Sequence, residues 1–153
     1  MNNVTIRRAI KEDYKDVKKL MQSVQNLHHS KRSDIHKDSE IFKEDEYQKN
    51  MESITVAEIN NNVIGAIMYF IKEKLENNYT HYRKVLFIDA LVVDPKFRNY
   101  GIGKTLIKEI ERIARENNCT SVELNVWAFN ENAIKFYEKI GMKPKTMILE
   151  KSI

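Results

Sequence analysis

The nine residues VLFIDALVV, at positions 85–93, are apolar except for Asp89, and they constrain the fold more than any other segment. Such a run is typical of a central strand that is buried on both faces of a sheet. Pro95 closes the run, and the stretch FRNYGIGKT at 97–105 then supplies two of the four glycines. An apolar stripe with helical spacing follows, formed by Ile102, Leu106, Ile110 and Ile113. The pattern predicts a buried strand, a glycine loop and an amphipathic helix in succession.

The flanking segments predict the remaining strands and helices. The strands are expected at 4–8, 54–58, 63–71, 122–126 and 146–150, and the helices at 11–28, 43–52 and 130–140. Polar, irregular connections are expected at 28–40 and 73–83. Because the first half is rich in hairpins and the second half alternates strands with helices, the order favours a mixed α/β sheet over a doubly wound parallel one.

Length, charge and cysteine content narrow the class of protein. The 153 residues predict a single domain over 1–153, and Cys119, the only cysteine, excludes an internal disulfide or a Cys-rich metal site. The net charge is +4, and the basic residues are interleaved with acidic ones instead of forming a basic stripe. This distribution argues against nucleic-acid binding. No apolar run approaches the roughly 20 residues that span a bilayer, and the polar N-terminus lacks a secretory h-region. A cytoplasmic protein without membrane contact is expected.

The glycine stretch can be compared with three phosphate-binding patterns. A triphosphate-binding P-loop needs a first glycine where this chain has Arg98, and a dinucleotide fingerprint needs a glycine where it has Leu106. The third pattern, R-x-x-G-x-G, is matched by Arg98, Gly101 and Gly103. Unpaired N–H groups at a helix start suit a phosphate, and glycine lets it approach the backbone.

The R-x-x-G-x-G match resembles the signature of the GCN5-related N-acetyltransferases (GNAT). The downstream stretch NVWAFNENAIKFYEKIGM, at 125–142, is similar to the strand and helix that follow it in that family, and LHHSKRSDI at 27–35 resembles a loop of some bacterial members. The resemblance covers essentially the whole chain. It implies a small single-domain GNAT fold, with a mixed, mostly antiparallel sheet splayed between strands 4 and 5 and flanked by helices. It also implies transfer of an acetyl group from acetyl-CoA to a primary amine, by direct attack in a ternary complex.

The resemblance assigns cofactor contacts to individual positions. Backbone amides of the 98–104 loop would hold the pyrophosphate, and the backbone around 91–93 would bind the pantetheine arm, with an amide of Val92 or Val93 polarising the thioester. Asn130 would contact the pantetheine amide or cap its helix. The implied cofactor residues are Leu91, Val92, Val93, Arg98, Asn99, Tyr100, Gly101, Ile102, Gly103, Lys104, Asn130, Ala133 and Tyr137.

Two catalytic residues are expected. Tyr137 resembles the family tyrosine that protonates the leaving thiolate, although its helical spacing with Ala133 and Phe136 also fits a core residue. Asp89 stands out because an ionised carboxylate in an apolar strand is costly unless it is paired or set in a cavity. It would take the proton of the amine or orient it. The alternative is a structural acid paired with a base such as Arg83.

The acceptor side is less defined by the sequence. His28, His29 and Asp89 are expected to line the acceptor pocket, and no pair of histidines has metal-binding helix spacing, so no metal is expected. Between Lys31 and Glu46 there are six acids and four bases, which favours a cationic acceptor, although a peptide or protein amine stays open. A homodimer is possible. The alternative function is a sensor or interaction module that binds acyl-CoA without turnover.

Overall fold

The structure is a computed structural model that describes residues 3–153. The predicted domain 1–153 therefore includes two residues, 1 and 2, that lie outside the described ones. The strands are β1 (Thr5–Arg8), β2 (Ile54–Ile59), β3 (Asn62–Lys74), β4 (Arg83–Val93) and β5 (Ser121–Leu124). The helices are α1 (Tyr14–Lys31), α2 (Glu44–Asn50), α3 (Ile102–Glu116) and α4 (Glu131–Lys139), with short 3₁₀ turns at Lys11–Asp13, Met51–Ser53 and Pro95–Phe97.

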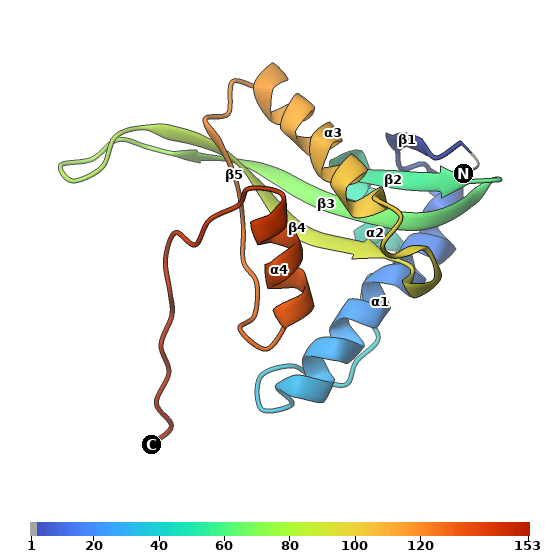
Figure 1. Cartoon of the computed structure of the whole chain (residues 1–153), viewed down its shortest axis with the longest axis horizontal. Helices are drawn as coiled ribbons and strands as arrows, with labels where there is room; N and C mark the ends of the chain where they lie inside the picture. Colours follow the sequence, from blue (N-terminus) through green and yellow to red (C-terminus); the bar gives the residue numbers. More distant parts are fainter. Residues whose placement is uncertain (1–2) are drawn as a thin grey trace.

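The five strands form one sheet in the order β1-β2-β3-β4-β5 (Figure 1). Neighbouring strands are antiparallel except for β4 and β5, which run parallel. The parallel pair follows from the chain order, because α3 carries the chain back across the sheet between these two strands. The predicted mixed, mostly antiparallel sheet is confirmed.

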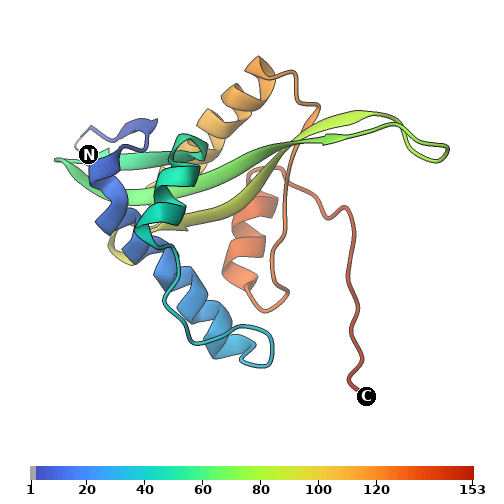
Figure 2. The same ribbon diagram turned by 180° about the vertical axis from the view of Figure 1, so that it is seen from behind.

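Both faces of the sheet are covered by helices. α3 and α4 lie on the face seen in Figure 1, and α1 and α2 lie on the opposite face (Figure 2). Along β3, Ile67 and Tyr69 join the core under α3, whereas Ala66 and Met68 join the core under α1. Because side chains alternate between faces, a strand covered on both sides is apolar at nearly every position.

The ladder between β3 and β4 contains a β-bulge at Asp89. Met68 is opposite Ala90 and Tyr69 is opposite Ile88, so Asp89 is the extra residue without a partner on β3. The pairing of β4 with β5 ends at the same level, at Ile88 and Leu124, although β4 continues to Val93. A bulge bends its strand and increases the local twist. The two parallel strands therefore separate at Asp89, as the predicted splay requires.

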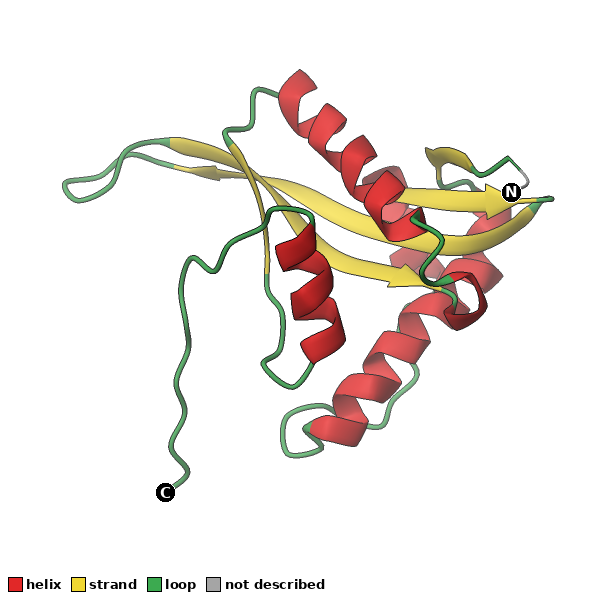
Figure 3. Cartoon of the chain, viewed as in Figure 1, coloured by secondary structure: helices red, strands yellow, loops and turns green. Residues whose placement is uncertain are grey.

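Three expectations about the elements are wrong. Residues 146–150 form no strand, and Figure 3 shows the chain after α4 as a loop to its end. α1 continues to Lys31, three residues beyond the predicted end of the helix. The strand 85–93 is not buried along its whole length, because Asp89 is exposed at the bulge, where the neighbouring strand has left.

Within residues 3–153, no helix combines the length and apolar character that crossing a bilayer requires.

Candidate active site

A cavity of about 230 Å³ opens where β4 and β5 separate. Its floor is the bulged part of β4, and its walls come from the end of β5, from α4 and from the last turns of α1. The lining residues are Val24, His28, Phe87, Ile88, Asp89, Ala90, Leu91, Leu124, Asn125, Val126, Trp127, Asn130, Ala133 and Tyr137. Six residues that the sequence implicates are thus brought to one place: His28, Asp89, Leu91, Asn130, Ala133 and Tyr137.

The phenol of Tyr137 lines this cavity from α4. Its ring packs edge-on against Phe136, with ring centroids 5.2 Å apart. Burial raises the pKa of Tyr137 to about 12, because the phenolate would lose its hydration there. The side chain is therefore a protonated hydrogen-bond donor at neutral pH, and its position at the cavity wall differs from that of a simple core residue.

Asp89 reaches the cavity from the bulge in β4. Within residues 3–153 its carboxylate makes no ion pair or hydrogen bond to another side chain. The alternative of a structural pair with Arg83 is wrong, since Arg83 Nη1 lies 3.3 Å from Glu123 Oε1 instead. The carboxylate is therefore available to a bound molecule.

The glycine loop lies at the end of β4, beyond the cavity. The backbone N–H groups of residues 99–104 make no backbone hydrogen bond within the described residues, and the first intrahelical bond runs from Thr105 N to Gly101 O at 3.0 Å. These N–H groups are the unsatisfied donors of a helix start, where the helix dipole adds partial positive charge. The loop therefore leaves six successive backbone donors unpaired at the start of a helix, which suits the binding of an anion.

Two glycines shape this loop for different reasons. Gly101 caps α3 with a φ of 79°, a left-handed conformation that favours glycine. A Cβ on Gly103 would come within 3.1 Å of the Phe136 ring, so the missing side chain lets α3 and α4 meet closely. Ile102, between them, is buried in the core, which leaves only its backbone for a ligand.

Beyond Ile88, the edge of β4 on the side of β5 pairs with no other strand among the described residues. Asp94 N donates to Ile64 O of β3 at 2.8 Å, so its amide points toward β3. Amides of successive residues in a strand point in opposite directions, which places the N–H groups of Val93 and Leu91 on the free edge and that of Val92 toward β3. Arg98 Nε donates to Val93 O at 3.1 Å and thereby joins the start of the glycine loop to this edge.

Asn130 caps α4 and also lines the cavity. Its Oδ1 accepts a hydrogen bond from Ala133 N at 3.3 Å. The capping role that the sequence allowed is therefore present, and it holds the start of α4 at the mouth of the cavity.

A cluster of aromatic side chains lies beside the part of the cavity that Val24 and His28 of α1 line. The rings of His28 and His36 lie 4.9 Å apart, and His36 meets Trp127 edge-on at 5.1 Å. Burial, followed by the proximity of His36, lowers the pKa of His28, which favours its neutral form. His29 does not line the cavity; its Nδ1 lies 2.8 Å from His36 O.

Sequence reasoning missed this aromatic cluster, of which His28 and Trp127 line the cavity and His36 and Phe129 pack behind them. His36 and Trp127 are 91 positions apart, and no local pattern indicates their contact. Phe129, which stacks on Trp127 with ring centroids 5.8 Å apart, was missed for the same reason. In residues 3–153, no cluster of three or more His, Cys, Asp or Glu side chains is arranged to hold a metal ion.

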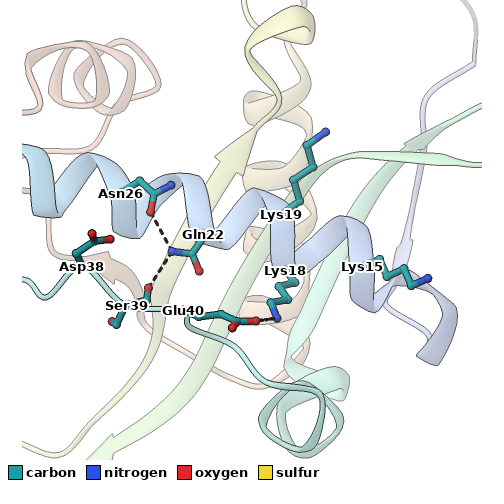
Figure 4. Close-up of a pocket in the computed structure, with 8 residues that line it drawn as sticks. All are labelled: Lys15, Lys18, Lys19, Gln22, Asn26, Asp38, Ser39 and Glu40. Atoms are coloured by element: carbon teal, nitrogen blue, oxygen red, sulfur yellow. Dashed lines mark hydrogen bonds and ion pairs between the residues drawn. The ribbon is translucent and has the colours of Figure 1, made fainter.

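A second hollow of about 530 Å³ lies between α1 and the chain at 38–40 (Figure 4). Its lining is entirely polar or charged, and it includes none of the predicted site residues. Gln22 spans it, donating to Ser39 O at 3.0 Å and to Asn26 Oδ1 at 2.9 Å. The bond to Ser39 O holds the segment 38–40 against α1.

Solved structures share this fold. The BH1408 protein of Bacillus halodurans aligns with a TM-score of 0.92 at 24% identity, covering 97% of this chain and 99% of that one. The aminoglycoside N-acetyltransferase AAC(6')-Iy, solved in complex with CoA, aligns with a TM-score of 0.76 at 16% identity, covering 100% and 96%. At these identities, the likeness establishes the fold.

The family follows from the sequence match. The model described as Acetyltransferase (GNAT) family matches residues 18–142, so the chain belongs to this family. A glucosamine 6-phosphate N-acetyltransferase of Trypanosoma brucei brucei is 33% identical over 81 residues, 53% of this chain and 51% of the relative. A thialysine N-epsilon-acetyltransferase of Sus scrofa is 28% identical over 61 residues, 40% and 36%. The matched segments span about half or less of these curated relatives.

Proposed function

We propose that this chain is an acetyl-CoA-dependent N-acetyltransferase that moves the acetyl group to a primary amine by direct attack in a ternary complex. Membership of the GNAT family supports the reaction class. The observation that carries the proposal is the cavity between β4 and β5 where the two strands separate. Tyr137 and Asp89 both line this cavity, beside the unpaired edge of β4. We treat residues 1–153 as one catalytic domain.

The glycine loop is the proposed site of the cofactor pyrophosphate. The free N–H groups of residues 99–104 would hold it at the start of α3, and Lys104, which is exposed there, would add positive charge. The Nε of Arg98 is already bonded to Val93 O, so this side chain fixes the loop as well as contributing charge. A Cβ at Gly103 would come within 3.1 Å of the Phe136 ring, which would have to shift to accept it.

The free edge of β4 is the proposed site of the pantetheine arm. An extended ligand can add to such an edge as a further strand, through backbone hydrogen bonds. Leu91 and Val93 present their amides there, so one of them, and not Val92, would donate to the thioester carbonyl and stabilise its oxyanion. This revises the expected choice between Val92 and Val93. Ala133 and Asn130 would border the same arm from α4.

Tyr137 and Asp89 divide the proton transfers between them. As the amine nitrogen bonds to the acetyl carbon and the C–S bond breaks, Tyr137 would donate its proton to the departing thiolate. Asp89 would take the proton that the amine loses, directly or through water. An amine of pKa about 10 is mostly protonated at neutral pH, so an anionic group beside it also favours its binding.

The Asp89 role is tested by the variant Asp89→Asn. We expect kcat/KM for the amine to fall about 100-fold, because the amide is isosteric but accepts no proton. The pH–rate profile should also change shape, while affinity for CoA stays the same. Glu76→Gln, an exposed carboxylate in the β3–β4 loop, is the matched control. An unchanged pH profile in Asp89→Asn would remove it as the base.

The acceptor is proposed to be a small cationic amine. The acids near His36, and Asp89 in the cavity, support a positively charged ligand. Sugar phosphates, lysine analogues and aminoglycosides occur in the names of relatives and structural neighbours, and a peptide amine stays among the candidates.

Thiol release from acetyl-CoA, measured with a panel of polyamines, aminoglycosides, amino sugars, amino acids and peptides, tests the function directly. We expect saturable release with at least one primary amine and a matching acetylated product by mass spectrometry. If no amine is acetylated while calorimetry shows tight CoA binding, the chain is an acyl-CoA-binding module and the proposal fails.

A further inference from the structure

The outer ends of β3 and β4 carry basic side chains on one face. Figures 1 and 2 show these ends running out past the helices as a hairpin arm. Because side chains alternate between faces, Lys72 and Lys74 of β3 lie on the same face as Phe70, which packs against the core under α1. Arg83 of β4 is opposite Lys74 and shares this face. Lys72, Lys74 and Arg83 are called here the basic face.

The basic face borders the cavity between β4 and β5. Lys72 Nζ lies 3.7 Å from the centroid of the Phe87 ring, and Phe87 lines that cavity. This cation–π contact holds the ammonium group of Lys72 beside the cavity wall. Asp89 follows Phe87 by two positions, which is about 7 Å along a strand. A molecule bound beside Asp89 therefore lies only a few bonds away from the charge of Lys72.

The positive charge of the basic face is only partly neutralised. Among residues 3–153, Lys72 and Lys74 form no ion pair, whereas Arg83 Nη1 lies 3.3 Å from Oε1 of Glu123. Lys145 donates to the same oxygen of Glu123. This hydrogen bond outweighs the burial of Glu123 and, with the charges of Arg83 and Lys74, lowers the pKa of that carboxyl. One carboxylate among four cations leaves the surface with a net positive charge.

Two opposite charges therefore stand side by side at the cavity. We propose that the amine acceptor also carries a carboxylate or phosphate group, and that Lys72 binds this anion while Asp89 binds the ammonium group. The inference rests on the proposed function and deepens it: the ammonium group remains the cationic part of the acceptor, and the anionic group belongs to the same molecule. Complementary charges of this kind chiefly give a site its specificity.

An acceptor with a second positive charge fits this surface less well. Its second charge would meet Lys72, and a juxtaposition of like charges disfavours the wrong ligand. A carboxylate or a phosphate a few bonds from the amine instead gives Lys72 an anion to pair with, and lysine binds such groups as a point charge. The inference therefore names a class of acceptor, a small zwitterionic amine, and one residue that selects it.

Matched pairs of acceptors test the class. Thiol release from acetyl-CoA is measured with ε-aminocaproate against its neutral amide, and with aminopentyl phosphate against aminopentanol. We expect kcat/KM to be about tenfold or more higher for the anionic member of at least one pair, through a lower KM, and added salt should reduce the difference. The pair that shows it identifies the anion as carboxylate or phosphate. Acetylation confined to amines without an anionic group overturns the inference and leaves the proposed function standing, whereas no acetylation of any amine overturns both.

Three variants test the residue assignment with the same pairs. Lys72→Met keeps an aliphatic contact with Phe87 but removes the charge, so kcat/KM should fall about tenfold for the anionic acceptor alone, and Lys72→Arg should restore most of it. Glu123→Gln should raise the preference for the anion, because it removes the carboxylate that offsets the basic face. Lys84→Met is the matched control, since Lys84 lies on the same arm but alternates to the opposite face. Equal losses for both members of a pair in Lys72→Met would reveal a packing role and overturn the assignment.

Discussion

Replacing Tyr137 with Phe is expected to lower kcat about 100-fold or more, with little change in the affinity for CoA. The substitution removes only the hydroxyl, so the ring keeps its edge-on contact with Phe136. What is lost is a proton donor at the cavity wall, and positioned general acids contribute about 10²–10⁴ in rate. Steady-state thiol release gives kcat, and calorimetry with CoA gives the affinity.

The pH dependence sharpens the Tyr137 assignment. Because burial raises the pKa of this phenol to about 12, it stays protonated through the alkaline range in which most assays run. The wild-type rate should not decline below about pH 10 through loss of this proton. Tyr79→Phe, at a tyrosine 94% exposed in the β3–β4 loop, should leave kcat and CoA affinity unchanged. Parallel losses of kcat and CoA affinity in Tyr137→Phe would identify a packing residue instead of an acid.

The second large effect is expected on stability, at the ion pair that joins β1 to the start of α1. Arg7 donates to both carboxylate oxygens of Asp13, at 2.7 and 2.9 Å, and its Nε donates to Glu58 at 2.8 Å. Asp13 is 6% exposed and also accepts from Ile10 N at 2.8 Å. Arg7→Met would leave a buried carboxylate without its cation.

We expect Arg7→Met to lower the free energy of unfolding by about 3 kcal/mol at pH 7. Breaking a buried pair costs about 3–5 kcal/mol, and the lower end applies because the Arg7 side chain is 28% exposed. Urea denaturation followed by circular dichroism measures the change. Arg112→Met is the control, because that arginine also meets two carboxylates, Glu109 and Glu116, but on the exposed side of α3, where such pairs add little.

The same pair sets a pH dependence with a defined sign. Burial by itself raises the pKa of Asp13, but the hydrogen bonds from Arg7 and Ile10 outweigh it and lower that pKa. The stabilisation is therefore present above the unfolded-state value of about 4 and is lost as the pH falls below it. In Arg7→Met the unpaired carboxyl should protonate more readily. The stability gap between wild type and variant should narrow below pH 4, and a constant gap would contradict the assignment.

Local sequence patterns were sufficient to predict the glycine loop and the helix α3 that follows it. The spacing of Ile102, Leu106, Ile110 and Ile113 predicted α3, and all four are buried in it. Arg98, Gly101 and Gly103 predicted the family, which the match over residues 18–142 confirms. These features are local, because a helix face and a loop conformation depend on residues a few positions apart.

The aromatic cluster beside the cavity and the end of the chain depend on contacts that the sequence does not encode locally. The contact of His36 with Trp127 joins segments that no pattern connects. The apolar run 85–93 predicts a strand that is buried throughout, because the hydropathy of a segment does not reveal a β-bulge. The bulge at Asp89 exposes that one residue. The residues 146–150 have strand composition, but a strand exists only where an edge receives it, so propensity alone gave the wrong state.

The bulge in β4 also resets the phase of the strand. Before it, the even-numbered Leu86 and Ile88 point toward α3; after it, the odd-numbered Leu91 and Val93 do. Deleting Asp89 would make Ile88 and Ala90 consecutive opposite Tyr69 and Met68, so the two halves of β4 would join in one regular frame with Leu91 and Val93 still facing α3. Substitution of this residue alters the chemistry alone, whereas its deletion would remove the bulge that bends β4 away from β5 and would leave the pairing with β3 in register.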